Sequence, residues 1–308
     1  MEMTNKERYH QFCLNNSVYV PVFSRDWWMD AVCGPDQWDV YLVGDGMDIR
    51  AAFVYYLCED QEGVCIKRAP ITQNNGIIFK YPENQGVVAK QHYEEKIVDE
   101  ICDFIESLDL KRYEQQFHYS YTNWLPFFWR YYKETTRYTY VLEDTDNYES
   151  LLSNYASKTK NGLRKAQKYL HVEECTDIEE FYSVNKMSFD RQCLKPPYTI
   201  DILNRLYSSC LKNDAGLMLK AVDDEGKIHS VAMLVWDNES VYYVLNGTNP
   251  ELKMFQGNLL LIDYGIQFAH EKRLKFDFEG SVVKNINHVF REFGGIPKPY
   301  FRIYKDFK

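Results

Sequence analysis

The sequence lacks the patterns that identify metal sites, secreted proteins and membrane proteins. Its eight cysteines are scattered singly without a C-x-x-C pair, so neither a zinc site nor a compact disulfide framework is predicted. The seven histidines show no metal-ligand spacing, and we expect no metal. Residues 1–16 are too polar for a signal peptide, and no run approaches about 18 uninterrupted apolar residues. We therefore expect no transmembrane segment and a cytoplasmic protein.

Several catalytic fingerprints are also missing. The absence of a G-x-S-x-G elbow, a P-loop and a Rossmann glycine motif leaves nucleophilic hydrolases, NTPases and dinucleotide oxidoreductases without support. A net charge of −9 and a pI near 5.4 argue against DNA as a partner, because sequence-blind binding depends on Lys and Arg that neutralise phosphates. A local basic patch can still bind a phosphate.

What is present indicates a globular α/β protein. The chain has 308 residues, of which 45% are hydrophobic and 16% aromatic, so it can bury a large core. This length favours two domains, although a single α/β domain is also compatible with it. The polar, turn-forming residues 144–148 are the best boundary, which predicts domains at 1–143 and 144–308.

Both halves mix short strands with amphipathic helices. The aromatic run 124–132 is expected to pack in the core or between domains. In the second half, residues 216–245 are expected to form an antiparallel meander of three strands. The patterns predict helices at 24–33, 93–110, 148–170, 178–191, 199–212, 258–272 and 285–293, and strands at 38–43, 49–57, 64–67, 115–121, 136–142, 216–222, 227–236, 240–245, 275–279 and 300–304.

The most informative motif is the predicted strand 275–279. Side chains alternate across a strand, so Asp277 and Glu279 are expected on one face. Buried carboxylates are costly unless they are paired, solvated or used in chemistry. Glu279 is our candidate general base for an attacking amine, with Asp277 orienting substrate or pairing with a cation such as Arg291 or Arg302. The alternative is an edge strand whose acids face water.

Two further features are suited to a phosphate-bearing ligand. The loop 246–258 leads into an apolar helix, and the N–H groups of Gln256, Gly257, Asn258 and Leu259 are expected to cradle a pyrophosphate. The alternative is an ordinary glycine-containing helix entrance. In the helix 148–170, Lys160, Arg164 and Lys168 recur every four residues and form either a phosphate-binding stripe or a solvated face.

Taken together, these motifs resemble the FemAB-like branch of the GNAT superfamily, and the order of elements in the second half is the one expected of a GNAT fold. The resemblance spans nearly the whole chain. It is carried by residues 160–168, 249–252, 276–281, 290–295 and 299–300, and in the first half by 23–28, 36–40 and 123–127.

The resemblance implies two tandem GNAT-like domains with mixed, mainly antiparallel sheets flanked by helices. Its members include N-acetyltransferases and aminoacyl-tRNA-dependent enzymes of peptidoglycan bridges, in which an amine attacks a carbonyl. The implied site lies in the second domain or between the domains. Its oxyanion donors would be backbone N–H groups near Tyr243, Leu245 and Asn246, acyl-CoA such as acetyl-CoA would be the co-substrate, and Tyr300 would contact substrate.

One departure from the family pattern leaves the donor open. Acyl-CoA-binding relatives have small residues before the helix, whereas this chain has Met254, Phe255 and Gln256. Three functions therefore remain. They are an acyl-CoA-dependent N-acyltransferase acting on an amine of a sugar, amino acid or envelope precursor, an aminoacyltransferase that uses aminoacyl-tRNA, and a non-catalytic GNAT-like binding protein.

Overall fold

The computed structural model describes residues 3–15, 18–61, 63–280 and 283–307. It divides into two compact units, Met1–Arg137 with Pro299–Lys308, and Tyr138–Lys298. The units therefore part inside a strand and not at the turn after residue 143, and the last residues belong to the first unit. They do so because Arg302–Asp306 pair with Arg112–Gln116 of the first unit.

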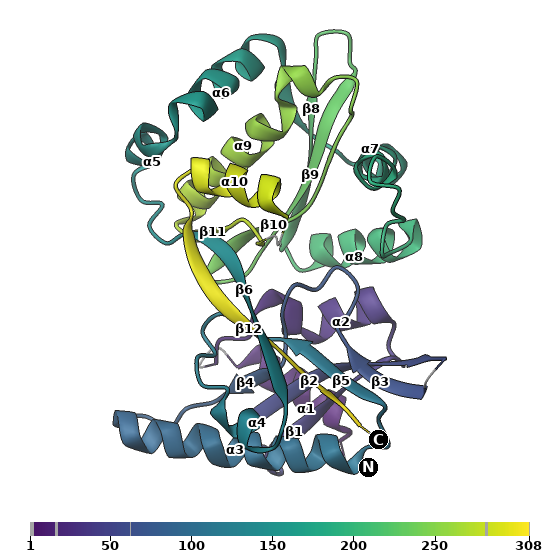
Figure 1. Cartoon of the computed structure of the whole chain (residues 1–308), viewed down its shortest axis with the longest axis vertical. Coiled ribbons are helices and arrows are strands. Elements are labelled where there is room, and N and C mark those ends of the chain that lie inside the picture. Colours follow the sequence, from purple (N-terminus) through teal and green to yellow (C-terminus); the bar gives the residue numbers. More distant parts are fainter. Residues whose placement is uncertain (1–2, 16–17, 62, 281–282, 308) are drawn as a thin grey trace. The chain divides into compact units, whose positions relative to one another are not determined.

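The first unit contains a sheet in the order β1-β2-β3-β5-β12, in which β4 also pairs with β2. Strands β3 and β5 pair in parallel, and the other described pairs of this unit are antiparallel. Strands β6 (Lys133–Leu142) and β12 (Ile296–Asp306) each continue from one unit into the other. The remaining elements are α1 (Asn5–Leu14), α2 (Asp26–Cys33), β1 (Trp38–Asp45), β2 (Asp48–Asp60), β3 (Gly63–Lys67), β4 (Ile77–Phe79), α3 (Val87–Ser107), β5 (Arg112–Gln116) and α4 (Leu125–Trp129), drawn in Figure 1.

Helix α1 is an element that the sequence patterns did not predict. It begins with a capping box, in which Thr4 and Glu7 each bond the other's backbone. It is anchored by Tyr9, which is buried and donates a hydrogen bond to the carbonyl of Ser24 at 2.6 Å. One buried aromatic with a satisfied hydroxyl therefore holds a largely polar helix.

The aromatic run at 124–132 packs as expected on one face only. Phe127 and Tyr132 are buried, whereas Phe128, Trp129 and Tyr131 are exposed, Tyr131 to 87%. The expectation that this run packs in the core is confirmed for Phe127 and Tyr132. It is wrong for Phe128, Trp129 and Tyr131.

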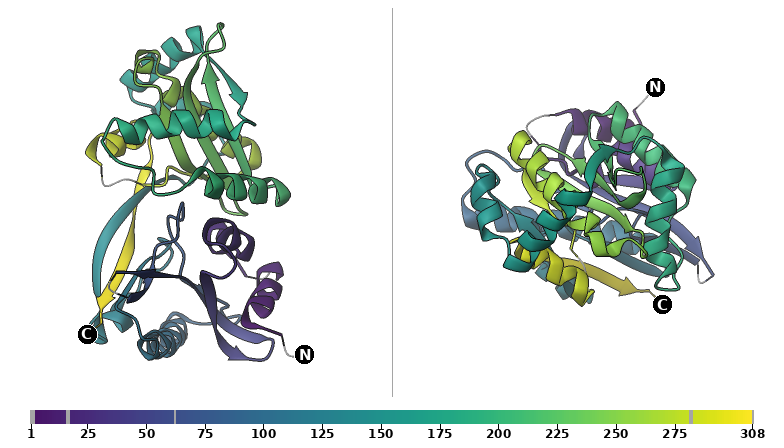
Figure 2. Two further views of the ribbon diagram at one scale, coloured as in Figure 1. Left: turned by 90° about the vertical axis from the view of Figure 1, so that its right-hand side faces the viewer. Right: turned by 90° about the horizontal axis from the view of Figure 1, so that it is seen from above.

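The second unit contains a sheet in the order β6-β11-β10-β9-β8-β7. The predicted meander of β8, β9 and β10 is confirmed, and β10 pairs in parallel with β11. Helices α7 and α8 pack on one face of the sheet and α9 packs on the other (Figure 1); in Figure 2, left, the first two cross in front of the strands. The elements are α5 (Tyr148–Asn154), α6 (Ser157–Tyr169), β7 (His171–Glu174), α7 (Ile178–Asp190), α8 (Ile200–Lys212), β8 (Gly216–Val222), β9 (Ile228–Trp236), β10 (Ser240–Thr248), α9 (Gly257–Lys272), β11 (Lys275–Asp277) and α10 (Lys284–Glu292).

The single helix predicted over 148–170 is instead two helices. Tyr155 and Ala156 have extended backbone dihedrals, and the N–H of Ala156 donates to the carbonyl of Glu292 at 2.8 Å. Tyr155 is buried against Phe293, with its hydroxyl bonded to Asp263. Burial of this ring outweighs the helical propensity of the segment.

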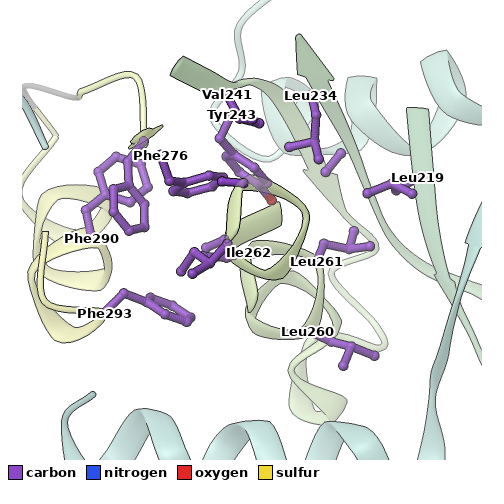
Figure 3. Packing of buried hydrophobic residues seen from close by; sticks show 14 of the residues in the cluster. Leu219, Leu234, Val241, Tyr243, Leu260, Leu261, Ile262, Phe276, Phe290 and Phe293 are labelled. Carbon is purple, nitrogen blue, oxygen red and sulfur yellow. The ribbon is translucent and has the colours of Figure 1, made fainter. Parts of the chain in front are cut away.

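Helix α9 is the centre of the second unit's core. Its residues Leu260, Leu261 and Ile262 belong to one buried cluster with Leu219 and Leu234 of the strands and Phe290 of α10, all of them labelled in Figure 3. An apolar helix of this kind packs on all sides. This packing fixes the position of its first turn relative to β10.

No helix among the described residues combines the length and apolar character that a membrane span requires. Those residues also contain no group of three or more His, Cys, Asp or Glu arranged to bind a metal.

Candidate active site

Strands β10 and β11 pair for only three residues and then part. The parallel register joins Ser240 to Lys275, Val241 to Phe276 and Tyr242 to Asp277. The pairing with β10 ends there, whereas on its other edge the N–H of Phe278 continues the antiparallel pairing with β6 by donating to the carbonyl of Tyr140 at 2.9 Å. Strand β10 continues to Thr248, so its residues 243–248 border an opening that we call the β10/β11 wedge.

The start of α9 lies at this wedge. The hydroxyl of Tyr243, the first residue of β10 beyond the paired segment, donates to Oδ1 of Asn258 at 2.9 Å. Asn258 is the second residue of α9. The first N–H groups of an α-helix have no partner within the helix, and the helix dipole makes that end positive. The wedge and an anion-favouring helix terminus are thus adjacent.

A β-bulge disrupts β10 just beyond the last paired residue. The register to β9 shifts between Tyr243 and Leu245, which leaves Val244 as an extra residue. Leu245 is partly exposed and Asn246 is exposed. The Asn246 carbonyl accepts a hydrogen bond from Nδ2 of Asn185 on α7 at 2.7 Å. Bulges re-aim backbone groups, so this one directs peptide N–H groups away from the β9 ladder.

Asp277 is buried at the base of the wedge with a hydrogen-bonded carboxylate. Its Oδ1 accepts from the hydroxyl of Thr139 and from the N–H of Glu279, the latter at 2.8 Å. The side chain is 2% exposed, and burial raises the pKa of Asp277 to about 6. This carboxylate holds the turn that follows β11.

Glu279 occupies that turn and lies outside the strand. The predicted strand to residue 279 is too long, so Asp277 and Glu279 do not share a strand face as alternation would give. Glu279 is partly buried and has a left-handed φ of 59°, which is uncommon for a residue with a side chain. Such conformations persist where the surroundings impose them, and they concentrate at functional sites. Asp277 and Glu279 are thus held next to each other by the hydrogen bond from the Glu279 N–H to the Asp277 carboxylate, and not by a shared strand face.

Gly280 allows the turn to approach β6. A Cβ at this position would lie 2.0 Å from the carbonyl oxygen of Tyr138 and 2.7 Å from Cα of Thr139. Both are backbone atoms that cannot move aside cheaply. The N–H of Gly280 also donates to Oγ1 of Thr139 at 3.1 Å.

We therefore expect Gly280→Ala to lower the free energy of unfolding by about 2–3 kcal/mol, because overpacking forces the backbone apart. Urea denaturation measures this. The control is Gly86→Ala, where the new Cβ meets nothing within 4 Å and only the N-cap preference of α3 is changed, which should cost no more than about 1 kcal/mol. Equal effects of the two substitutions would contradict a tight turn at Gly280.

The entrance to α9 is closely packed by neighbouring elements. Gln256, its N-cap, has a left-handed φ of 64° and no side-chain cap. A Cβ on Gly257 would lie 2.9 Å from Oγ of Ser230, and a Cβ on Gly162 of α6 would lie 2.8 Å from Cδ1 of Leu259. Helix α6 thus crosses the start of α9 at Gly162, beside the bulky residues before the helix.

This crossing sorts the basic residues of α6 into two groups. Gly162 faces the start of α9, and Lys158 and Lys165, at four residues before and three after it, share its side of the helix. The residues that we singled out from their spacing, Lys160, Arg164 and Lys168, lie on the side turned away from Gly162. The Nζ of Lys160 also donates to the carbonyl of Ser153 at 2.5 Å.

Tyr300 belongs to the first unit. It is buried, and its hydroxyl accepts a hydrogen bond from Nε2 of Gln73 at 3.0 Å. Arg302 belongs to the same unit, where it pairs with Glu114. Arg291, the other suggested cation, is exposed on α10.

Two contributors to the site had no signal in the sequence patterns. Thr139 bonds Asp277 across 138 residues of chain. His229, which the sequence left as an isolated histidine, is buried beside Phe255, and its Nε2 lies 2.9 Å from Oδ2 of Asp223. This hydrogen bond lowers the pKa of Asp223. The backbone carbonyl of His229 accepts from Asn249 N–H, so the pair supports the loop before α9.

Comparison with known families identifies the domain that contains this site. Residues 153–283 match the family described as acetyltransferase (GNAT) domain. The match covers most of the second unit. The parted strands, the bulge and the start of α9 all lie within the matched residues. A comparison with curated protein sequences gives no match.

Solved structures extend the likeness to the whole chain. The crystal structure of FemX aligns with a TM-score of 0.70 at 12% identity, over 98% of this chain and 96% of FemX. The C-terminal domain of a putative lysylphosphatidylglycerol synthetase from Agrobacterium fabrum aligns with 0.61 at 10%, over 98% and 92%. A tandem GNAT protein from the clavulanic acid biosynthesis pathway aligns with 0.54 at 9%, over 97% and 94%. The predicted α/β fold, with two tandem GNAT-like domains, is confirmed.

Proposed function

We propose that this protein is an N-acyltransferase that moves an acyl group from an activated donor to an amine at the β10/β11 wedge. The observation that carries the proposal is the Tyr243–Asn258 hydrogen bond, because it joins the point where the strands part to the first turn of α9. An acyl donor needs both an opening for its carbonyl and a site for its phosphates. The GNAT match over these residues supports acyl transfer.

In this proposal the acceptor amine attacks the donor carbonyl, the new C–N bond forms, and the C–S or C–O bond of the donor breaks. Glu279 accepts the proton that the attacking nitrogen loses, and the leaving group departs as a thiolate or alkoxide that takes up a proton from solvent. Backbone N–H groups near Tyr243, Leu245 and Asn246 stabilise the oxyanion. Asp277 fixes the turn that presents Glu279.

The proposed donor is an acyl-CoA such as acetyl-CoA, whose pyrophosphate the N–H groups of Gln256, Gly257, Asn258 and Leu259 would bind. The proposed acceptor is an amine of a sugar, amino acid or envelope precursor. Thermal stability with coenzyme A, acetyl-CoA and longer acyl-CoAs tests the donor. A ligand at 100 times its dissociation constant stabilises by about 2.7 kcal/mol, and the absence of any shift would sink the CoA proposal.

A second donor, aminoacyl-tRNA, is favoured by one observation. Phe255 and Gln256 place bulk at the helix entrance, and a Cβ on Gly162 would lie 3.7 Å from Cγ of Gln256, so α6 crowds the space for a pyrophosphate. The exposed Arg164 and Lys168 on the far side of α6 would then contact tRNA phosphates.

The two groups of basic residues distinguish the donors. We expect Lys158→Gln with Lys165→Gln to weaken acyl-CoA binding about tenfold, since these lysines share the face of Gly162, and the matched pair Arg164→Gln with Lys168→Gln to leave it unchanged. Titration calorimetry measures both. If the second pair alone abolishes acyl transfer and reduces its salt dependence, the donor is aminoacyl-tRNA and the CoA assignment is wrong.

A further inference from the structure

The first unit repeats one arrangement of the second unit, a parallel strand pair that ends after a few residues. Strands β3 and β5 pair in parallel at Cys65–Arg112 and Ile66–Tyr113. Beyond this pair β5 keeps its antiparallel pairing with β12, which the N–H of Phe117 continues by donating to the carbonyl of Phe301 at 2.9 Å. On the other edge of β5 the carbonyl of Gln116 accepts from the N–H of Asn75 at 3.0 Å, so the segment around Asn75 lies beside the carboxyl end of β5. Ligands of open α/β sheets bind at such positions.

A cavity of about 270 Å³ lies beside the carboxyl end of β5. It is lined by the segment 74–81, which includes β4, by the segment 117–122, and by Val18, Tyr19, Pro21, Ser24 and Glu94 (β4 and β5 are labelled in Figure 1). Every lining residue belongs to the first unit. The volume lies just below the usual range for small-molecule sites, so it suits a compact ligand.

Aromatic rings form a flat apolar surface in this cavity. Phe79 stacks on Tyr81 and on Tyr121, with interplanar angles of 20° and 10°, and Phe117 packs on Tyr121 with ring centroids 4.9 Å apart. The absence of a side chain at Gly76, which has a φ of 124°, makes room for the Phe117 ring, because a Cβ there would lie 2.9 Å from Cε1 of Phe117. Parallel rings of this kind favour another ring in an offset stack.

Two of the lining residues have buried polar atoms that the protein leaves without hydrogen bonds. Oδ1 of Asn74 and the hydroxyl of Tyr121 have no partner, and each side chain is about nine-tenths buried. A buried polar atom without a partner is unfavourable, and native proteins contain few of them. An amide oxygen only accepts, so its missing partner is a hydrogen-bond donor.

The charged groups of the cavity already have partners of opposite charge. Nζ of Lys80 lies 3.8 Å from Asp48, and Glu94 lies 3.8 Å from Nζ of Lys90 and accepts a hydrogen bond from the Tyr81 hydroxyl at 2.6 Å. A charged ligand would lose its hydration here and find these groups already neutralised, which disfavours it.

We propose that this cavity is a ligand site for a compact, uncharged, ring-bearing molecule that donates a hydrogen bond to Asn74. The site is separate from the β10/β11 wedge and does not depend on the function proposed there.

Three probes that share one ring and differ in charge test the proposal. They are benzamide, which is neutral and donates, benzoate, which is an anion, and benzamidine, which is a cation. Ligand-observed NMR on the full chain is expected to show binding of benzamide and at least tenfold weaker binding of the other two. Binding of none, or tightest binding of benzamidine or benzoate, would overturn the proposal.

Variants locate the binding and separate it from a structural role. Asn74→Ala and Tyr121→Phe should each weaken benzamide about fivefold, which corresponds to one hydrogen bond. Tyr121→Phe should not lower the melting temperature, because it removes only a hydroxyl that has no partner in the protein. Phe128→Ala on exposed α4 is the control and should leave binding unchanged. Benzamide affinity that is insensitive to both cavity variants would refute the site.

Discussion

Replacement of Glu279 by glutamine is expected to lower kcat for acyl transfer about 100-fold, which is a typical contribution of a general base. The substitution keeps the size of the side chain and the backbone N–H that bonds Asp277. The loss should shrink as the pH approaches the pKa of the acceptor amine, because a larger fraction of the amine then attacks already deprotonated. Steady-state kinetics from pH 6 to 10 measure both effects.

A surface carboxylate provides the control. Glu239 lies between β9 and β10 and pairs with Lys275 at 2.8 Å, so Glu239→Gln removes a charge from the same unit without touching the wedge. Its kcat should stay within about twofold of wild type. Full activity of Glu279→Gln with a donor and acceptor that wild type uses would remove Glu279 from the mechanism. If no donor is ever turned over, the protein is a non-catalytic GNAT-like binder.

Replacement of Asp277 by asparagine is expected to stabilise the protein at neutral pH and not at acidic pH. The pKa of Asp277 is raised from 3.8 to about 6 in the folded state, because burial disfavours its charged form. Below pH 3.8 the carboxyl is protonated in both states and adds no cost. As the pH rises from 3.8 to 6 the unfolded state releases the proton first, so wild type loses stability, by about 3 kcal/mol in total.

Asparagine avoids this loss because it stays neutral, and its Oδ1 can accept from Thr139 and Glu279 as the carboxylate Oδ1 does. Urea denaturation at intervals from pH 4 to 8 should therefore show the difference between variant and wild type growing up to pH 6 and then levelling off. Asp224→Asn, at an exposed turn, should give a curve parallel to wild type. A constant difference across the whole range would show that Asp277 is ionised in the folded state throughout.

The sequence predicted most elements of the second unit because its strands and helices are apolar runs bounded by turn residues. The β8–β10 meander and α9 are examples, since β9 is buried along most of its length and α9 at half of its residues. The first unit's α1 and β4 escaped because one is mostly polar and the other has three residues. Tyr155 shows the limit of periodicity, because only its contacts with Phe293 and Asp263 explain the break between α5 and α6.

The candidate site was predictable in its residue types and less so in its geometry. The motif around Asp277 and Glu279 stood out by composition, but the turn after β11 is held by Thr139 and Tyr140, far away in the sequence, which bond Asp277 and Phe278. The basic residues of α6 were chosen by their mutual spacing, whereas their direction depends on Gly162 meeting Leu259. Both features arise from contacts between distant segments, which local patterns do not encode.

The path of the chain through the first unit has a consequence for biosynthesis. Strand β5 pairs with residues 302–306, which are synthesised after the whole of the second unit. Until then β5 has an open edge of unpaired backbone groups, which invites pairing with another chain. The second unit is complete in sequence before the first can close. Expression of residues 1–137 alone should therefore give an aggregation-prone fragment, whereas joining residues 299–307 to that fragment through a short linker supplies the missing strand.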